Sequence, residues 1–383
     1  MKILQVVQKP QRRGAEIFAR QLSERLRVVG HEVRTAYLYP HAGDNSLPLH
    51  ASDEILDGRE HHCFERIPGI HPSLLRRLKR LIARWQPDIV QVNGGRTLKY
   101  GAAAATGSQP HRWALIYRSI GQPQRWFRGS FHRGVYSSLV LPRVHGVVSV
   151  SSSTLETLNE LYDLAMPTAR IPCAVDPDSL APSSPRAVIR READTPQEAR
   201  VVLYVGSLSA EKRVDRLLRV VKTARRTIPN LHLWIVGEGP LRSALEAQVK
   251  ASSLEPCVRF IGVQNEVSNY MRAADLVALT SDTEGMPAVV LEAGLLERAV
   301  VTTRVGGLSE CILDGTTGLL VERNDEIGFA QSIVQLFQQP DRLHTLGTTA
   351  RQWIEDNFVI AQIAEQYEAF YRHVLCGHAL RSN

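Results

Sequence analysis

The chain has 383 residues, which exceeds one compact core and predicts two domains of about 180–190 residues each. An apolar share of 44% and a charged share of 22% exclude a disordered or fibrous protein. No apolar run is long enough for a membrane-spanning helix, and the run after Met1 is too short for a signal peptide. The five cysteines are scattered and never spaced as C-x-x-C, which excludes a zinc ribbon or disulfide scaffold and favours a cytoplasmic protein.

Short β-branched runs alternate with segments of helical period along the whole chain. Phe18, Leu22 and Leu26, for example, recur every four residues between the first two runs. This alternation predicts parallel sheets whose two faces are covered by helices. The expected strands lie near 2–7, 31–38, 63–67, 88–93, 113–120 and 146–151, and then near 200–206, 231–237, 258–262, 276–281, 299–305 and 318–321.

A proline-rich segment at 172–185 marks the expected domain boundary. It predicts an N-terminal domain over residues 1–180 and a C-terminal domain over residues 181–359. The expected fold class is α/β, with two doubly wound domains facing across a cleft. Ligands of such sheets bind at the carboxyl ends of the strands, so the candidate residues are sought just after each strand.

Two glycine turns precede expected helices. Gly14 opens a helix after the first strand, where backbone N–H groups attract phosphate, although a plain tight turn would look the same. Lys212 follows Gly206 at the start of another helix and can place its charge on a phosphate, whereas most lysines are only solvated.

A third turn begins like the dinucleotide-binding fingerprint G-x-G-x-x-G. Gly237 and Gly239 fill its first two glycine positions, but Arg242 stands at the third. This argues against a nicotinamide dehydrogenase.

The segment from Ser281 to Ala293 is the strongest candidate site. Glu284 lies in a loop, Pro287 suits the first turn of the following helix, and Glu292 lies inside that helix. Helical side chains lean toward the N-terminus, so both carboxylates can face one crevice that also holds free backbone N–H groups. That arrangement suits a polyol attached to a phosphate. The alternative is one exposed glutamate and one on a helix face.

Taken in order along the chain, these motifs resemble family 4 of the retaining glycosyltransferases, which have the two-domain GT-B fold with Rossmann-like domains. The likeness is most specific over residues 200–321 and looser in the first half. The matching segments are 206–212, 236–242, 258–262, 274–276, 284–293, 305–307 and 314–321, with 14–16, 30–33 and 87–90 in the first half.

The resemblance implies that a nucleotide-diphosphate-sugar donates its sugar to a hydroxyl of a glycan, a glycolipid or a small-molecule acceptor. Lys212 would hold the diphosphate and Glu284 the sugar hydroxyls, and these two are the catalytic candidates. Glu292 would hold the ribose. The other implied donor-binding residues are Gly14, Ser207, Arg213, Gly237, Gly239, Val263, Gly285, Met286 and Pro287. The C-terminal helix, within 360–383, would pack back on the N-terminal domain.

The sequence departs from the family pattern at several positions. Ser207 stands where the family usually has arginine, so one phosphate contact is either missing or moved to Arg213. Glu297 and Ala299 replace a usual glycine and proline. Many members have histidines after two strands of the first domain, but here Asn93 follows one strand and no histidine follows the other. No catalytic histidine is therefore assigned.

In the expected mechanism the leaving diphosphate takes the acceptor's proton, while the protein orients the reactants and stabilises charge. No metal cofactor is expected, and Asp176-Pro177-Asp178 is interpreted as part of the linker. The main alternative is a non-catalytic nucleotide-sugar-binding protein. A hydrolase with the two glutamates as acid and base leaves Lys212 unexplained, and a nucleotide-sugar epimerase would require acid–base residues that the sequence does not show.

Positive charge is concentrated in the first half, and residues 101–150 hold six arginines and no acidic residue. Arg125, Trp126, Arg128 and Arg133 interleave cations with an aromatic ring, which predicts a patch for the acceptor or for an anionic membrane surface. The expected location is therefore the cytoplasm, with peripheral contact at the inner face of the membrane. The apolar stripe of the basic 74–85 helix is expected to pack on the sheet. No nucleic-acid partner is expected because no recognition motif accompanies the charge.

Overall fold

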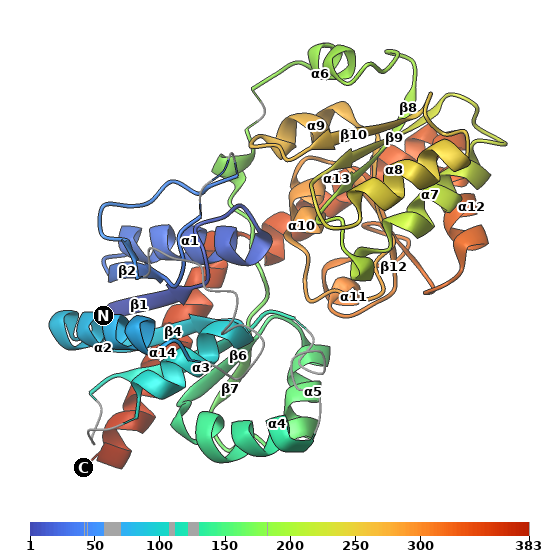
Figure 1. Ribbon diagram of the computed structural model, residues 1–383. Helices are drawn as coiled ribbons and strands as arrows, with labels where there is room; N and C mark the ends of the chain where they lie inside the picture. Colours follow the sequence, from blue (N-terminus) through green and yellow to red (C-terminus); the bar gives the residue numbers. More distant parts are fainter. Residues whose placement is uncertain are drawn as a thin grey trace. The chain divides into compact units, whose positions relative to one another are not determined.

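The computed structural model describes residues 1–41, 43, 45–56, 70–106, 112–121, 130–181 and 183–382. The chain divides into two compact units, Met1–Ala174 with Ile360–Asn383, and Val175–Val359. Each unit is built on its own parallel sheet with helices packed on it (Figure 1). The first unit ends a little before residue 180, and the C-terminal helix belongs to it.

The first unit contains a seven-stranded sheet in the order β3-β2-β1-β4-β5-β6-β7, and its strands pair in parallel. Two short strands, β3 and β7, were not predicted, because runs of two and three residues carry no readable period. The strand expected at 63–67 lies outside the described residues. The strands are β1 Lys2–Val7, β2 Glu32–Tyr37, β3 Glu54–Ile55, β4 Ile89–Asn93, β5 Ala114–Ser119, β6 Gly146–Ser149 and β7 Thr168–Arg170.

Helices cover this first sheet, and one of them is the basic helix α2. Leu74, Leu78, Leu81, Ile82 and Trp85 of α2 are buried in the core, while its charged side chains are exposed, so the predicted packing of its apolar stripe is confirmed. The α-helices of the unit are α1 Gly14–Val28, α2 Pro72–Trp85, α3 Gly95–Ala104, α4 Ser130–Val135, α5 Ser152–Tyr162 and α14 Ile360–Ser382. Within the described ranges, no helix combines the length and the hydrophobicity needed to cross a bilayer.

A buried polar network joins the C-terminal helix α14 to the first sheet. The Tyr371 hydroxyl donates to Gln91 Oε1 at 2.6 Å, and Gln91 Nε2 donates to Gln5 Oε1 at 3.1 Å. Asn93 Nδ2 donates to the same Gln5 oxygen at 2.9 Å. Because each buried amide finds partners here, the network fixes the position of α14 on the sheet. The Asn93 side chain is therefore part of the packing of this unit.

The second unit contains a six-stranded parallel sheet in the order β10-β9-β8-β11-β12-β13. Its central strands are buried on both faces, as their continuous apolar runs predict. The strands are β8 Arg200–Val205, β9 Leu231–Val236, β10 Val258–Gly262, β11 Leu276–Leu279, β12 Ala299–Thr303 and β13 Leu319–Val321. The α-helices are α6 Arg186–Glu192, α7 Val214–Ala224, α8 Arg242–Ala251, α9 Val267–Ala273, α10 Ala288–Leu295, α11 Leu308–Cys311, α12 Glu326–Gln338 and α13 Pro340–Asn357.

Candidate functional site

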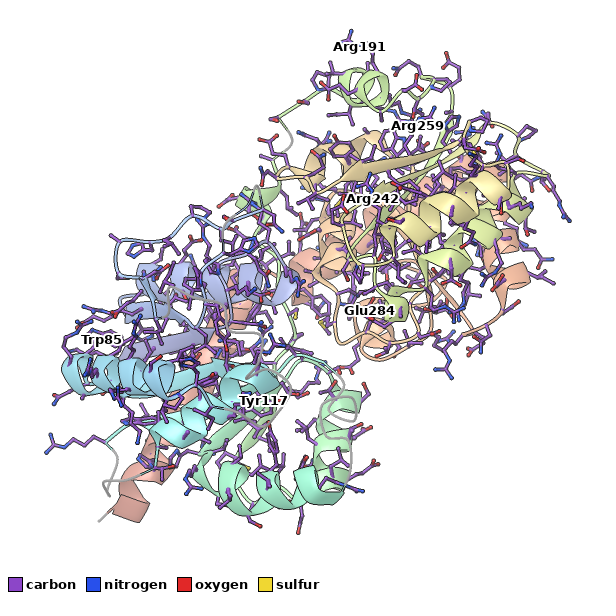
Figure 2. All side chains as sticks on the ribbon, in the orientation of Figure 1. Trp85, Tyr117, Arg191, Arg242, Arg259 and Glu284 are labelled. Atoms are coloured by element: carbon purple, nitrogen blue, oxygen red, sulfur yellow. The ribbon has the colours of Figure 1, made fainter. Side chains whose placement is uncertain are left out.

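The strand order of the second sheet reverses between β8 and β11, which are hydrogen-bonded neighbours. In doubly wound sheets this reversal opens a crevice at the carboxyl ends of the two strands. Lys212 follows β8, and Glu284, which is labelled in Figure 2, follows β11. The Lys212 ammonium donates to Glu284 Oε1 at 2.7 Å and to Oε2 at 2.8 Å, so the two predicted residues form an ion pair at this point.

Neighbouring hydroxyls hold the Glu284 carboxylate in place. Ser281 Oγ donates to Glu284 Oε1 at 2.6 Å, and Thr303 Oγ1 at the end of β12 donates to the Ser281 carbonyl at 2.6 Å. The side chain of Glu284 is only 6% exposed, whereas that of Lys212 is 22% exposed. A carboxylate this buried requires a charged partner, because an unpaired buried charge is costly. Ser281 and Thr303 were not assigned to the site from the sequence. Their positions, Ser281 just after β11 and Thr303 as the last residue of β12, are the signal that could have found them.

Glu292 lies in the middle of α10, the helix that follows the Glu284 loop. The helix begins at Ala288, so Pro287 is its N-cap residue. The sequence had predicted Pro287 one position later, in the first turn of the helix. Burial raises the pKa of Glu292 to about 7. Its carboxyl group therefore changes charge near neutral pH, unlike an ordinary solvated glutamate. The first two N–H groups of α10, those of Ala288 and Val289, have no acceptor within the helix, whereas the Val290 N–H donates to the Pro287 carbonyl at 3.1 Å.

Glycines allow the loops of the site to pack backbone against backbone. Gly306, with φ of 54°, follows β12, and a Cβ atom there would overlap the Glu284 carbonyl oxygen. The adjacent Gly307 N–H donates to the Gly285 carbonyl at 2.8 Å. Gly237, with φ of 132°, lies in the same way against the Gly206 carbonyl. These glycines thus let the loops that carry Lys212 and Glu284 pack closely. This packing explains the glycine spacing without a dinucleotide fingerprint.

An ion-pair network lies beside the Lys212–Glu284 pair. Arg213 binds Asp215 through Nε at 3.0 Å and Asp282 through Nη1 at 3.1 Å. Arg216, which is buried, binds Asp282 Oδ1 at 2.8 Å and the Thr280 carbonyl at 2.9 Å. The Arg213 guanidinium is thus engaged by two carboxylates, so its donor contact remains a prediction that would require these pairs to open. Asp282 and Arg216 are structural residues of the site that the sequence did not reveal.

The remaining predicted donor-binding residues of this unit lie around the same strand ends. Ser207 Oγ lies 2.9 Å from Ser209 Oγ, within a hydroxyl chain that reaches Glu211. Val263, directly after β10, is 39% exposed. Met286 is buried beneath the loop. Gly239 packs against the Leu208 backbone, where a Cβ atom would lie 2.5 Å from the Leu208 carbonyl oxygen.

The other predicted residues belong to different parts of the chain. Gly14 is the first residue of α1 in the first unit and is exposed. Arg125, Trp126 and Arg128 lie outside the described residues, and Arg133 is exposed on α4. Asp176 accepts a hydrogen bond from the Asp178 N–H at 3.1 Å and so caps a short helix. This contact agrees with the interpretation of the Asp-Pro-Asp triplet as a linker element.

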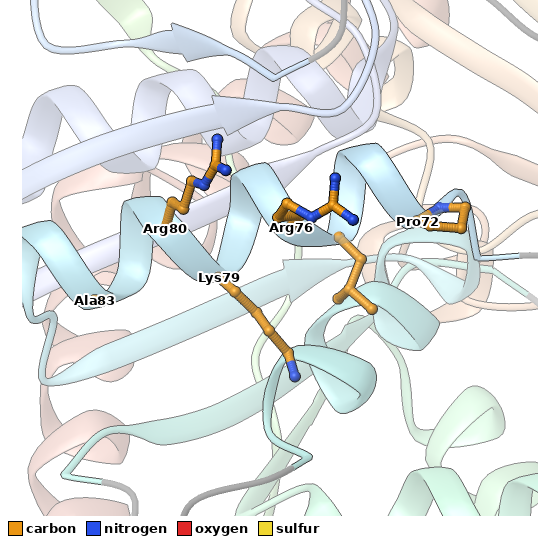
Figure 3. A pocket seen from close by; sticks show the side chains of 6 residues that line it. Pro72, Arg76, Lys79, Arg80 and Ala83 are labelled. Atoms are coloured by element: carbon orange, nitrogen blue, oxygen red, sulfur yellow. The ribbon is translucent and has the colours of Figure 1, made fainter.

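The outer face of α2 carries a shallow groove of about 420 Å³ (Figure 3). Arg76, Lys79 and Arg80 extend from it beside the apolar side chains of Leu75 and Ala83. Arg76 and Arg80 are exposed, and neither has an ion-pair partner in the part of the chain that the structure describes. The groove therefore presents uncompensated positive charge.

Comparison with known proteins matches both halves of the chain. Residues 12–179 match the model of Glycosyltransferase Family 4, and residues 185–353 match that of the glycosyl transferases group 1. N-acetyl-alpha-D-glucosaminyl L-malate synthase of Bacillus anthracis is 29% identical over 187 residues, which is 49% of this chain and 49% of that protein. The aligned region thus spans about half the length of this relative.

Solved structures share the fold over nearly the whole chain. Sucrose-phosphate synthase from Thermosynechococcus elongatus aligns with a TM-score of 0.83 at 21% identity, covering 98% of this chain and 100% of that one. HepE from Anabaena, crystallised with UDP and glucose, aligns with a TM-score of 0.80 at 21% identity, covering 97% and 100%. The predicted α/β architecture is therefore confirmed as GT-B. The two family models together match most of the chain, which belongs to the glycosyltransferases of family 4 and group 1.

Proposed function

We propose that this protein transfers a sugar from a nucleotide-diphosphate-sugar to an acceptor hydroxyl and retains the configuration of the anomeric carbon. The observation that carries the proposal is the Lys212–Glu284 ion pair at the reversal of the strand order. A cation and a hydrogen-bond-accepting carboxylate side by side match the two parts of such a donor, its diphosphate and its sugar hydroxyls.

Donor binding would separate this pair. The Lys212 ammonium would turn to the diphosphate, and the Glu284 carboxylate would accept hydrogen bonds from the sugar hydroxyls while it keeps Ser281. Glu292, when ionised, would accept from the ribose hydroxyls. The HepE structure contains UDP and glucose, which supports a ligand of this class for the shared fold. A ligand group would replace the partner that each residue loses, so neither charge would be left buried and unpaired.

The reaction that follows requires little side-chain chemistry. The bond between the anomeric carbon and the diphosphate oxygen breaks, and the acceptor oxygen forms its bond on the same face of the sugar. The acceptor's proton passes to the leaving diphosphate oxygen. Lys212 and the first N–H groups of α10 would stabilise the negative charge that develops there.

The test is incubation of the full chain with a panel of nucleotide-sugars and a panel of acceptors. The proposal expects release of a nucleoside diphosphate that depends on both substrates, and a product whose anomeric configuration, measured by NMR, equals that of the donor. An inverted product would contradict retention. If a nucleotide-sugar binds tightly but no acceptor gives turnover, the result would favour the alternative, a non-catalytic nucleotide-sugar-binding protein.

A further inference from the structure

A polar pocket of about 640 Å³ lies at the amino ends of the strands of the second sheet, whereas the Lys212–Glu284 pair lies at their carboxyl ends. Arg272 precedes β11 and Arg298 precedes β12, whereas Glu284 follows β11. Since a four-residue strand spans about 13 Å, a small ligand here does not reach the donor site. We call it the arginine pocket, and its lining residues are Ser183, Ser184, Pro185, Arg186, Arg272 and Arg298.

Only one acidic side chain forms ion pairs with the arginines of this region, among the described residues, and its oxygens are already used. Asp275 Oδ1 accepts from Arg186 at 2.6 Å. Asp275 Oδ2 accepts from the buried Arg190 at 3.0 Å and from the Val201 N–H at 2.8 Å. Two guanidinium groups therefore share one carboxylate. Arg272 and Arg298 are left without an ion-pair partner in the described parts of the chain.

Both of these arginines have N–H groups to offer a ligand. Arg298 donates through Nε to the Leu296 carbonyl at 3.0 Å and through Nη1 to the Ala274 carbonyl at 3.2 Å, which leaves Nη2 without a partner in the described structure. Arg272 is exposed at the end of α9. Burial, and then the positive charge of Arg186, lower the pKa of Arg298, while the carboxylates of Asp275 and Glu297 offset part of this effect.

Hydrogen bonds to Asn269 hold the serine segment that also lines the pocket. The buried Asn269 of α9 accepts through Oδ1 from the backbone N–H of Ser183 at 2.8 Å and of Ser184 at 3.1 Å. The neighbouring acid, Glu266, accepts from Asn269 Nδ2 at 2.8 Å and from the Ser183 hydroxyl, so it is engaged away from the arginines. The Ser184 hydroxyl has no partner among the described residues and adds a further donor. The pocket is thus preorganised around donors and positive charge.

We propose that the arginine pocket binds a phosphorylated small molecule, a phosphate ester or a diphosphate, at a site separate from the donor site. Guanidinium groups bind phosphate oxygens through paired N–H donors, and three of them converge on one pocket. The volume lies within the range of about 300–1,000 Å³ that small ligands occupy. The inference does not depend on the proposed sugar transfer.

Calorimetric titration with inorganic pyrophosphate tests the site. All titrations use the full chain carrying Lys212→Ala, which removes the lysine contact proposed for the diphosphate and weakens binding at the donor site. The further loss caused by a change in the arginine pocket then reports on that pocket. Arg272→Ser is the test variant, because this side chain is exposed and forms no ion pair among the described residues. Arg226→Ser is the matched control, since Arg226 is also exposed and unpaired among the described residues of the same unit.

Loss of one charge-assisted contact predicts that Arg272→Ser weakens pyrophosphate binding about tenfold, while Arg226→Ser leaves it unchanged. Arg298→Gln, which keeps a polar N–H donor but removes the positive charge, should weaken it as well. Absence of binding in the Lys212→Ala background, or equal losses in the Arg272 and Arg226 variants, would overturn the proposal. Equal losses would mean that pyrophosphate responds only to the overall charge.

Discussion

Lys212 and Glu284 lie 72 positions apart in the chain, yet the ammonium of one sits 2.7 and 2.8 Å from the two carboxylate oxygens of the other. The pair exists because β8 and β11 are neighbours in the sheet, so the loops after them meet. Each group neutralises the other in the absence of a ligand. The proposed transfer depends on the separation of this pair when a donor binds between the two groups.

The unfolding free energy of single and double variants measures this coupling. Lys212→Met leaves the buried Glu284 carboxylate with Ser281 as its remaining partner, and should lower stability by about 2–4 kcal/mol. Glu284→Gln should cost less, because the more exposed lysine regains water. The double variant should be more stable than the sum of the single losses predicts, by at least about 1 kcal/mol. Strict additivity in urea unfolding would show that the pair contributes nothing.

The ionised Glu292 carboxylate should lower the stability of the folded protein and favour nucleotide binding. Its pKa is raised to about 7 by burial, whereas in the unfolded chain it returns to the ordinary value near 4.5. Between these values the unfolded chain has lost a proton that the native state retains, so stability from this group falls as pH rises from 4.5 and is fully lost above 7. Glu292→Gln should therefore raise the melting temperature at pH 8 but leave it nearly unchanged at pH 4.

The same group should give nucleotide binding a pH dependence. If the ionised carboxylate accepts from the ribose, affinity for the nucleoside diphosphate should rise as pH increases through about 7 in the wild type. Glu292→Gln should remove that rise and weaken binding by about tenfold at pH 8. Calorimetry at pH 6 and pH 8 checks both points. An unchanged pH profile in the variant would assign the dependence to another group.

Gly306→Ala should displace the Glu284 loop, because the new Cβ atom would overlap the Glu284 carbonyl oxygen. Gly315→Ala is a matched control, since Gly315 also has a positive φ but nothing within 4 Å of its Cβ position. The control should lose only about 1 kcal/mol from backbone strain, and keep its activity. Gly306→Ala should lose more stability and at least tenfold in turnover. Equal effects of the two changes in thermal unfolding and rate would refute the close-packing argument.

Turnover should not require a divalent metal. Lys212 and the N-terminus of α10 can supply the positive potential that the leaving diphosphate requires. Dialysis against a chelator should leave the rate within twofold of its original value. Loss of activity that magnesium or manganese restores would contradict this expectation.

The groove on α2 should bind anionic surfaces weakly. Each cation near such a surface adds about 1 kcal/mol, so changing Arg76 and Arg80 together to Ser should reduce sedimentation with phosphatidylserine vesicles by about tenfold or more. Changing Arg226 and Arg323 together to Ser removes the same charge from exposed positions of the second unit and serves as control. Equal binding of both double variants to anionic vesicles would make the groove an ordinary solvated surface.

Much of this architecture is predictable from the sequence, because long buried strands have continuous apolar runs. Lys212 and Glu284 could be placed at strand ends for the same reason. Their mutual contact could not, since it depends on which strands are neighbours. Nor could the engagement of Arg213 by Asp282, which requires the loop after β11 to fold beside the start of α7. The raised pKa of Glu292 depends on burial, which is a property of the folded unit and carries no local signature in the sequence.

The rate of nucleoside diphosphate release by Lys212→Ala, compared with Lys222→Ala, tests the central claim most directly. Lys222 lies exposed on α7, so its removal changes the same charge in the same unit without touching the site. The account predicts that Lys212→Ala lowers kcat/KM by about 10–150-fold, corresponding to a lost charge-assisted contact, while Lys222→Ala remains at the wild-type rate. Wild-type turnover in the Lys212 variant, with the protein folded, would contradict the assignment of this ion pair to the donor.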